Sequence, residues 1–125
     1  GAARTKPRRE VRLPITEPML ALVQWAEPMR CSDFVLTLTG KPLSDVAVSK
    51  QLKRHTSQSI TVHGLRSSFR TWCQETGVEE TLAEMSLSHL VGSDVRRAYA
   101  RSDMLEERRR VMSDWSDFLG SIKSA

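Results

Sequence analysis

The stretch Ile60-Thr-Val-His63-Gly-Leu-Arg66-Ser-Ser-Phe69-Arg70-Thr-Trp72-Cys73 organises the middle of this chain. Its apolar residues Leu65, Phe69, Trp72 and Cys73 recur at the spacing of one helix face, which predicts a helix over about 64–76 with a buried stripe. Gly77 marks its C-terminal end. Arg66 and Arg70 fall one turn apart on an adjoining face, so the same helix presents cations beside its core.

Two residues farther along the chain complete a chemically coherent set. His63 and Arg66 in this stretch, His89 downstream and Tyr99, the single tyrosine of the chain, are the groups needed to hold a phosphate and attack it. Arginine grips two phosphate oxygens with a planar fork, histidine donates a hydrogen bond or proton near neutral pH, and tyrosine can act as a covalent nucleophile. Taken singly, each of these residues has an ordinary structural role as an alternative.

The remaining patterns predict a mainly helical α+β domain. Val11–Ile15 alternates apolar and polar residues and Phe34–Leu38 is a β-type run, so we expect a small antiparallel sheet at the N-terminal side. Thr16 and Ser44 are predicted helix caps. Further helices are expected over about 17–27, 45–55, 79–88, 94–101 and 103–122. The first should turn Met19, Leu20, Val23 and Ala26 inward; the last carries a stripe of Met104, Leu105, Arg108, Val111, Met112, Trp115, Phe118 and Leu119.

Composition is that of one globular domain. The 125 residues are 39% hydrophobic and 27% charged, with neither a membrane-span pattern nor a signal peptide. Two cysteines, Cys31 and Cys73, give neither a disulfide framework nor a zinc motif, so a reducing cytoplasm is expected. The abrupt start at Gly1 suggests a processed or cloned piece of a longer protein.

The net charge of +4 is concentrated near the N-terminus. Residues 1–12 carry five cations against one acid, which makes this segment alone +4. Such a block is either a solvated tail or, ahead of a strand pattern, a basic hairpin facing a polyanion. The cations are Arg4, Lys6, Arg8, Arg9 and Arg12, and the acid is Glu10.

Taken in order, His63-Gly-Leu-Arg66-Ser-Ser-Phe69, Leu87-Ser-His89 and Ala98-Tyr99 closely resemble the C-terminal catalytic part of tyrosine recombinases, above all phage and genomic-island integrases. The resemblance runs from the basic hairpin through Trp115. It implies site-specific DNA integration by strand cleavage and rejoining on double-stranded attachment sites, in the bacterial cytoplasm at the nucleoid, as a homo-oligomer on DNA. It implies no metal or other cofactor and no membrane.

The resemblance also implies residue roles. Tyr99 would attack the phosphodiester and form a 3′-phosphotyrosyl link, while Arg66, His63 and His89 would bind the scissile phosphate. Lys6 would be the general acid toward the leaving 5′ oxygen. DNA contacts are expected from Arg4, Arg8, Arg9 and Arg70.

Two departures from the family pattern shape the expected domain organisation. The family has another arginine upstream of the lysine hairpin and an N-terminal domain that clamps DNA, and neither lies within residues 1–125. The chain is therefore expected to be a single, incomplete catalytic domain that is inactive alone. Ser88 stands where the family usually has glycine or alanine, a minor change.

Alternatives of other classes remain open. A non-catalytic, winged-helix-like DNA-binding module would show an exposed recognition helix and no phosphate pocket around Arg66. A recombination accessory factor acting through protein contacts would bind DNA weakly and without salt dependence. The last helix could be core or could dock on a neighbouring protomer. Arg108-Arg-Arg110 is interpreted as part of its solvated face, with phosphate contact as the alternative.

Overall fold

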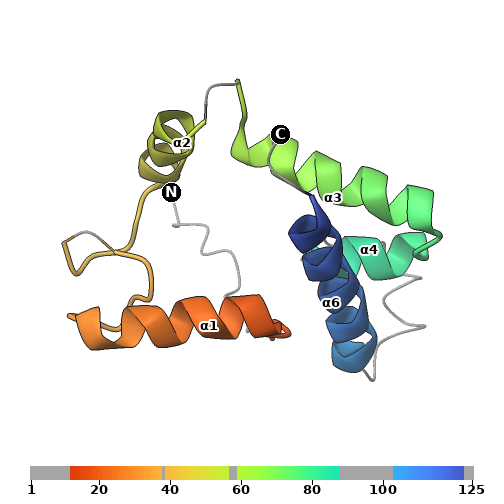
Figure 1. Cartoon of the computed structure of the whole chain (residues 1–125), viewed down its shortest axis with the longest axis horizontal. Coiled ribbons are helices and arrows are strands. Elements are labelled where there is room, and N and C mark those ends of the chain that lie inside the picture. The colour runs from red at the N-terminus through yellow and green to blue at the C-terminus, as the bar shows by residue number, and fades with distance from the viewer. Residues whose placement is uncertain (1–11, 38, 57–58, 88–102, 123–125) are drawn as a thin grey trace, which may run out of the picture.

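The computed structural model describes residues 12–37, 39–56, 59–87 and 103–122, and this part of the chain is helical. Figure 1 shows α3, α4 and α6 lying together, with α1 and α2 on the other side of the picture and α2 in contact with α3. The predicted helix over 94–101 lies outside the described residues. The elements are α1 (Glu17–Ala26), the short 3-10 helix η1 (Glu27–Met29), α2 (Asp45–Arg54), α3 (Val62–Thr76), α4 (Glu80–Ser86) and α6 (Leu105–Ser121).

The expected antiparallel sheet is wrong for the described residues, which contain no strand. The segment before α1 is extended, but the carbonyls of Arg12 and Ile15 accept hydrogen bonds from the side chains of Arg108 and Arg109. The second expected strand ends in a local turn, in which Thr37 bonds to the backbone of the Gly40–Lys41 segment. Alternation reports only a local tendency, whereas a strand needs a partner for its backbone groups.

The helix boundaries follow their capping residues. The Ser44 hydroxyl accepts from the backbone N–H of Ala47 at 3.1 Å, as a cap of α2. Gly77 ends α3 in the left-handed conformation, at φ +80°, which only glycine adopts without strain. Thr16 precedes α1 without capping it, because its buried hydroxyl is hydrogen-bonded to Ser116 of α6 at 3.1 Å.

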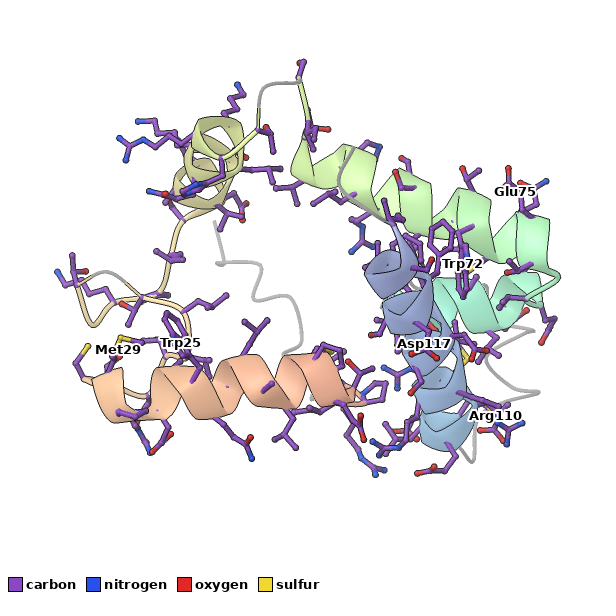
Figure 2. All side chains as sticks on the ribbon, in the orientation of Figure 1. Trp25, Met29, Trp72, Glu75, Arg110 and Asp117 are labelled. Atoms are coloured by element: carbon purple, nitrogen blue, oxygen red, sulfur yellow. The ribbon has the colours of Figure 1, made fainter. Side chains whose placement is uncertain are left out.

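The core lies between α3, α4 and α6. Cys73 is 1% exposed, and the Trp72 ring packs 5.2 Å from Trp115, centroid to centroid, so that aromatic rings join α3 to α6 (Figure 2). Phe69 meets Trp115 edge to face, a favoured geometry for aromatic pairs. The predicted stripe on α3 is confirmed except for Leu65, which is 50% exposed. Phe69, Trp72, Cys73, Ala83 and Val111 form the buried cluster.

The inward face predicted for α1 is wrong, since none of its residues is buried. Leu20 and Val23 are exposed, as are Trp25, at 71%, and Met29 in η1. In Figure 2 the side chains of Trp25 and Met29 lie far from the α3–α6 core. Amphipathic spacing shows which face of a helix can be buried; burial itself requires another element against that face.

None of the helices in the described part of the chain combines the length and apolar character that a membrane crossing requires.

The two cysteines should differ sharply in reactivity. Burial raises the pKa of the Cys73 thiol to about 11, against the opposing effect of the nearby Arg70 charge, whereas Cys31 is exposed. Because the thiolate is the reactive form, we expect a thiol reagent at pH 8 to label Cys31 rapidly and Cys73 only after denaturation. Mass spectrometry of the labelled peptides measures this, and equal labelling rates in the folded chain would contradict it.

The same shift sets a pH dependence. Between pH 9 and 11 the unfolded chain releases the Cys73 proton while the folded chain keeps it, so the free energy of unfolding should fall as pH rises through this window. Urea denaturation across this pH range measures the slope. Cys73→Ala should have a shallower slope whatever its absolute stability.

Candidate phosphate-binding site at the start of α3

The first turn of α3 is built to present His63. Thr61 caps the helix by accepting from the Gly64 backbone N–H at 2.9 Å. A Cβ on Gly64 would lie 3.0 Å from this Thr61 oxygen, so the glycine lets the cap close. His63 is exposed beside it. Helix N-termini attract anions through unpaired N–H groups and the helix dipole, which places an exposed histidine where an anion would be favoured.

Arg66 follows His63 by three positions, so the two side chains occupy neighbouring places on the helix surface. The Arg66 Nη2 donates a hydrogen bond of 2.8 Å to the carbonyl oxygen of Leu87. Leu87 is the C-cap of α4, where carbonyls lack helical partners and cations are favoured. Arg66 is thereby tied to the end of α4. Within the described residues this bond uses one of the five donors of the guanidinium group.

Arg70, one turn farther along α3, pairs with acids of α4. Its Nη1 contacts a carboxylate oxygen of Glu84, and its Nη2 lies 3.8 Å from Glu80. The Glu84 side chain is 17% exposed and that of Arg70 44%, so the inner pair is partly shielded from water. These contacts join α3 to α4 beside the Arg66–Leu87 bond.

The structure therefore brings two of the predicted site residues together and leaves most of the others untested. His63 and Arg66 share the start of α3, while Arg70 faces α4. Among the described residues, no group of three His, Cys, Asp or Glu side chains is placed to hold a metal ion. The predicted residues Lys6, His89 and Tyr99, and the predicted DNA contacts Arg4, Arg8 and Arg9, lie outside the described residues.

One arginine departs from its interpretation as part of a solvated helix face. Arg108 is 4% exposed and bonds to backbone carbonyls of Arg12 and Asp103. The signal was present in the sequence, because Arg108 falls at an apolar position of the α6 stripe. A charged residue at such a position indicates a buried, hydrogen-bonded cation.

The chain is similar to curated integrases. Prophage integrase IntA of Escherichia coli K12 is 34% identical over 128 residues, which cover 98% of this chain and 31% of that protein. Prophage integrase IntZ of the same strain is 38% identical over 84 residues, 66% of this chain and 21% of the relative. The integrase of Shigella phage Sf6 is 31% identical over 80 residues, 63% of this chain and 21% of the relative.

The chain thus spans about a third or less of the length of the curated relatives it matches. No family model matches it, and no solved structure does.

A double-mutant cycle should show that Arg70 and Glu84 stabilise the α3–α4 packing. With Arg70→Met and Glu84→Gln we expect a favourable coupling energy of about 1 kcal/mol in urea unfolding of the 125-residue chain, the upper end for partly exposed pairs. Glu80 is the matched control, because its side chain is 84% exposed. The cycle with Glu80→Gln should give a coupling near zero; equal coupling in the two cycles would contradict the assignment.

Proposed function

This chain belongs to the prophage and phage integrase family over the fifth to third of those proteins that it matches, and from that premise we propose that it supplies most of the catalytic centre of a site-specific DNA recombinase of the tyrosine type. The observation that carries the proposal is the Arg66–Leu87 bond. It fixes the predicted phosphate-binding arginine to the residue two positions before the predicted His89, a chain length that spans at most about 7 Å.

In the proposed cleavage step the phenolic oxygen of Tyr99 releases its proton to the solvent as it attacks the scissile phosphorus. A phosphorus–tyrosine bond forms, the bond to the 5′ oxygen breaks, and Lys6 gives its proton to that oxygen. Arg66, His63 and His89 bind the phosphate and stabilise its charge in the transition state. Phosphoryl transfer asks a protein mainly for positioning and charge stabilisation, which fixed cations supply.

Rejoining reverses the step. A 5′ hydroxyl attacks the phosphotyrosyl phosphorus and releases Tyr99, so the energy of the broken linkage is retained and no ATP is consumed. The step needs no metal. Without the upstream arginine and the DNA-clamping domain expected of the family, residues 1–125 alone should not cleave DNA.

The proposed partners are double-stranded attachment sites and further copies of the protein, in the bacterial cytoplasm and at the nucleoid when bound. The basic segment over residues 1–12 supports DNA binding through phosphate contacts, which position a protein but carry no sequence information. For assembly, the end of α6 is a candidate docking element: Phe118 and Leu119 are 42% and 47% exposed. Large exposed apolar side chains favour a protein contact.

Tyr99→Phe in the full-length gene product should abolish a covalent protein–DNA adduct. The substrate is a nicked duplex carrying the attachment site of the element, which traps the adduct because the short cleaved strand diffuses away. A denaturing gel reads the adduct, with DNA binding of both proteins measured in parallel. The phenylalanine lacks the attacking oxygen and otherwise preserves the ring.

An adduct that persists in Tyr99→Phe would place the nucleophile elsewhere. Intact DNA binding with no adduct from either protein would favour the non-catalytic binding module instead.

Lys6→Ala should be rescued by a better leaving group. If Lys6 protonates the 5′ oxygen, its loss should slow single-turnover cleavage by about 10²–10⁴-fold. A substrate with sulfur in place of the bridging 5′ oxygen leaves as a thiolate and needs no proton, so wild type and Lys6→Ala should cleave it at similar rates. Equal slowing on both substrates would show that Lys6 is not the acid. Lys41→Ala, an exposed lysine in a loop, is the control.

A further inference from the structure

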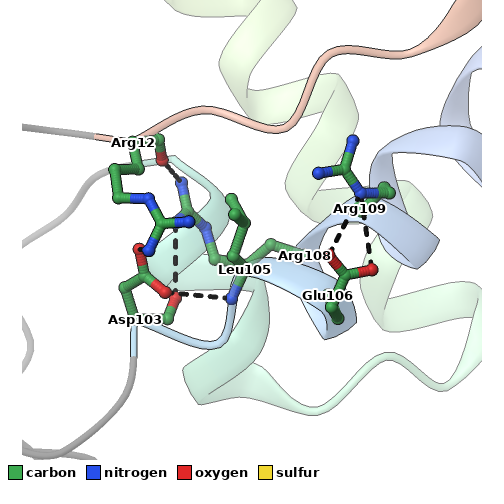
Figure 3. A network of polar contacts seen from close by, with 6 residues as sticks. All are labelled: Arg12, Asp103, Leu105, Glu106, Arg108 and Arg109. Carbon is green, nitrogen blue, oxygen red and sulfur yellow. Dashed lines mark hydrogen bonds and ion pairs between the residues drawn. The ribbon is translucent and has the colours of Figure 1, made fainter.

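We propose that Arg108 is a positioning residue for this reaction: its buried guanidinium joins the segment that follows Lys6 to the segment that follows Tyr99. The inference rests on the proposed function for the roles of those two residues. Its structural basis is independent of them and lies wholly in described residues around the start of α6 (Figure 3).

The Arg108 guanidinium bridges two backbone carbonyls that are far apart in the sequence. Its Nη2 donates to the carbonyl of Arg12 at 2.7 Å and its Nη1 to that of Asp103 at 3.3 Å. Arg108 is 4% exposed, so both bonds lie in a weakly screened environment, where hydrogen bonds to a charged group contribute more than neutral ones. A planar fork is suited to holding two acceptors at once, as a lysine ammonium is not.

Two further contacts lie at the same place, which we call the Arg12–Asp103 junction: the point where the segment before α1 meets the start of α6. The Arg12 guanidinium lies 3.4 Å from the Asp103 carboxylate. The other carboxylate oxygen of Asp103 accepts from the backbone N–H of Leu105, at 3.2 Å, in the first turn of α6. The side chains of Arg12 and Asp103 are 61% and 39% exposed, so this pair adds little stability by itself. The buried arginine is the main link.

The backbone at this junction is strained. Met104 has φ +55°, a left-handed conformation that costs a bulky residue free energy and persists where its surroundings impose it. The bonds of Arg108 and Leu105 to Asp103, on the N-terminal side of Met104, supply such a constraint. The direction in which the chain enters α6 is therefore held by these local bonds to Asp103, together with the long-range bond from Arg108 to the Arg12 carbonyl.

This geometry matters for the reaction because of chain connectivity. Tyr99 precedes Asp103 by four residues and Lys6 precedes Arg12 by six, so the two connecting segments span at most about 14 and 22 Å. Arg108 thus holds Asp103 and Arg12 together, the two described residues to which the segments carrying the proposed nucleophile and the proposed general acid are connected. An error of about 1 Å in such an arrangement can cost 10²-fold in rate.

The experiment compares charge-conserving variants in the full-length gene product. Arg108→Lys keeps the charge but replaces the rigid fork by a single ammonium nitrogen, which cannot reproduce the spacing of the two Nη donors. Arg110→Lys makes the same exchange at an exposed position of the same helix (Figure 2). Single-turnover cleavage of the nicked attachment-site duplex is followed over time at saturating DNA. The time course gives two separate quantities: the rate constant of cleavage, and an amplitude that reports the fraction of active protein. DNA affinity is measured at the same salt concentration.

We expect Arg108→Lys to lower the cleavage rate constant at least tenfold while DNA affinity changes less than twofold, and Arg110→Lys to match wild type. A merely structural role would reduce the amplitude and the melting temperature but leave the rate constant of the folded molecules unchanged. That result would overturn the proposal. If wild type forms no adduct at all, the proposed function fails first, and the two failures are thereby distinguished.

Asp103→Ala keeps the test decisive if Arg108→Lys does not fold. Asp103 is partly exposed, and the loss of its carboxylate removes the contacts with Arg12 and the Leu105 N–H that hold the Asp103 backbone, whose carbonyl is one end of the Arg108 bridge. We expect a smaller decrease in rate constant, about two- to fivefold, with unchanged DNA affinity. A rate constant equal to that of wild type would show that this junction does not position the reacting groups.

Discussion

The contact between α3 and α6 is the constraint on which the rest of the described structure depends. Phe69 and Trp72 of α3 pack against Trp115 of α6 around the fully buried Cys73. Aromatic side chains of this size supply most of the apolar area in so small a core. Once α3 is held on this side, its other surface can present His63 and Arg66 without contributing to the core.

Polar contacts then fix how the helices are oriented in this packing. Arg66 bonds the C-terminal carbonyl of α4, and Arg70 pairs with Glu84 on the same helix. At the other end of the cluster, Arg108 bonds carbonyls of Arg12 and Asp103. Three arginines are thus used as structural donors, whereas arginines that bind a polyanion have to be exposed to it. Buried or shielded guanidinium groups tolerate this because their Nη groups find acceptors, although within the described residues the buried Nε of Arg108 has no hydrogen-bond partner.

Part of the described chain is not packed in this way. Helix α1 has no buried residue, and its contact with α6 runs through the preceding segment, where Thr16 meets Ser116 and the Ile15 carbonyl accepts from Arg109. An isolated ten-residue helix is marginal in water. These backbone and hydroxyl contacts fix where α1 begins, while its apolar residues Val23 and Ala26 border the following segment without becoming buried.

The sequence by itself determined the helices of the described residues. Periodicity, Ser44 and Gly77 located their boundaries within a few residues, because these signals depend on neighbours in the chain. For the candidate site, His63-Gly-Leu-Arg66 predicts phosphate-binding groups. Only the tertiary structure decided that the expected sheet is absent from the described residues, that the face of α1 stays exposed and that Arg108 is buried. Strand pairing, the burial of a helix face and the carbonyls that accept from a buried arginine all depend on residues distant in the sequence, as many as 96 positions away for Arg108 and Arg12. A local sequence pattern does not encode which distant partner will be present.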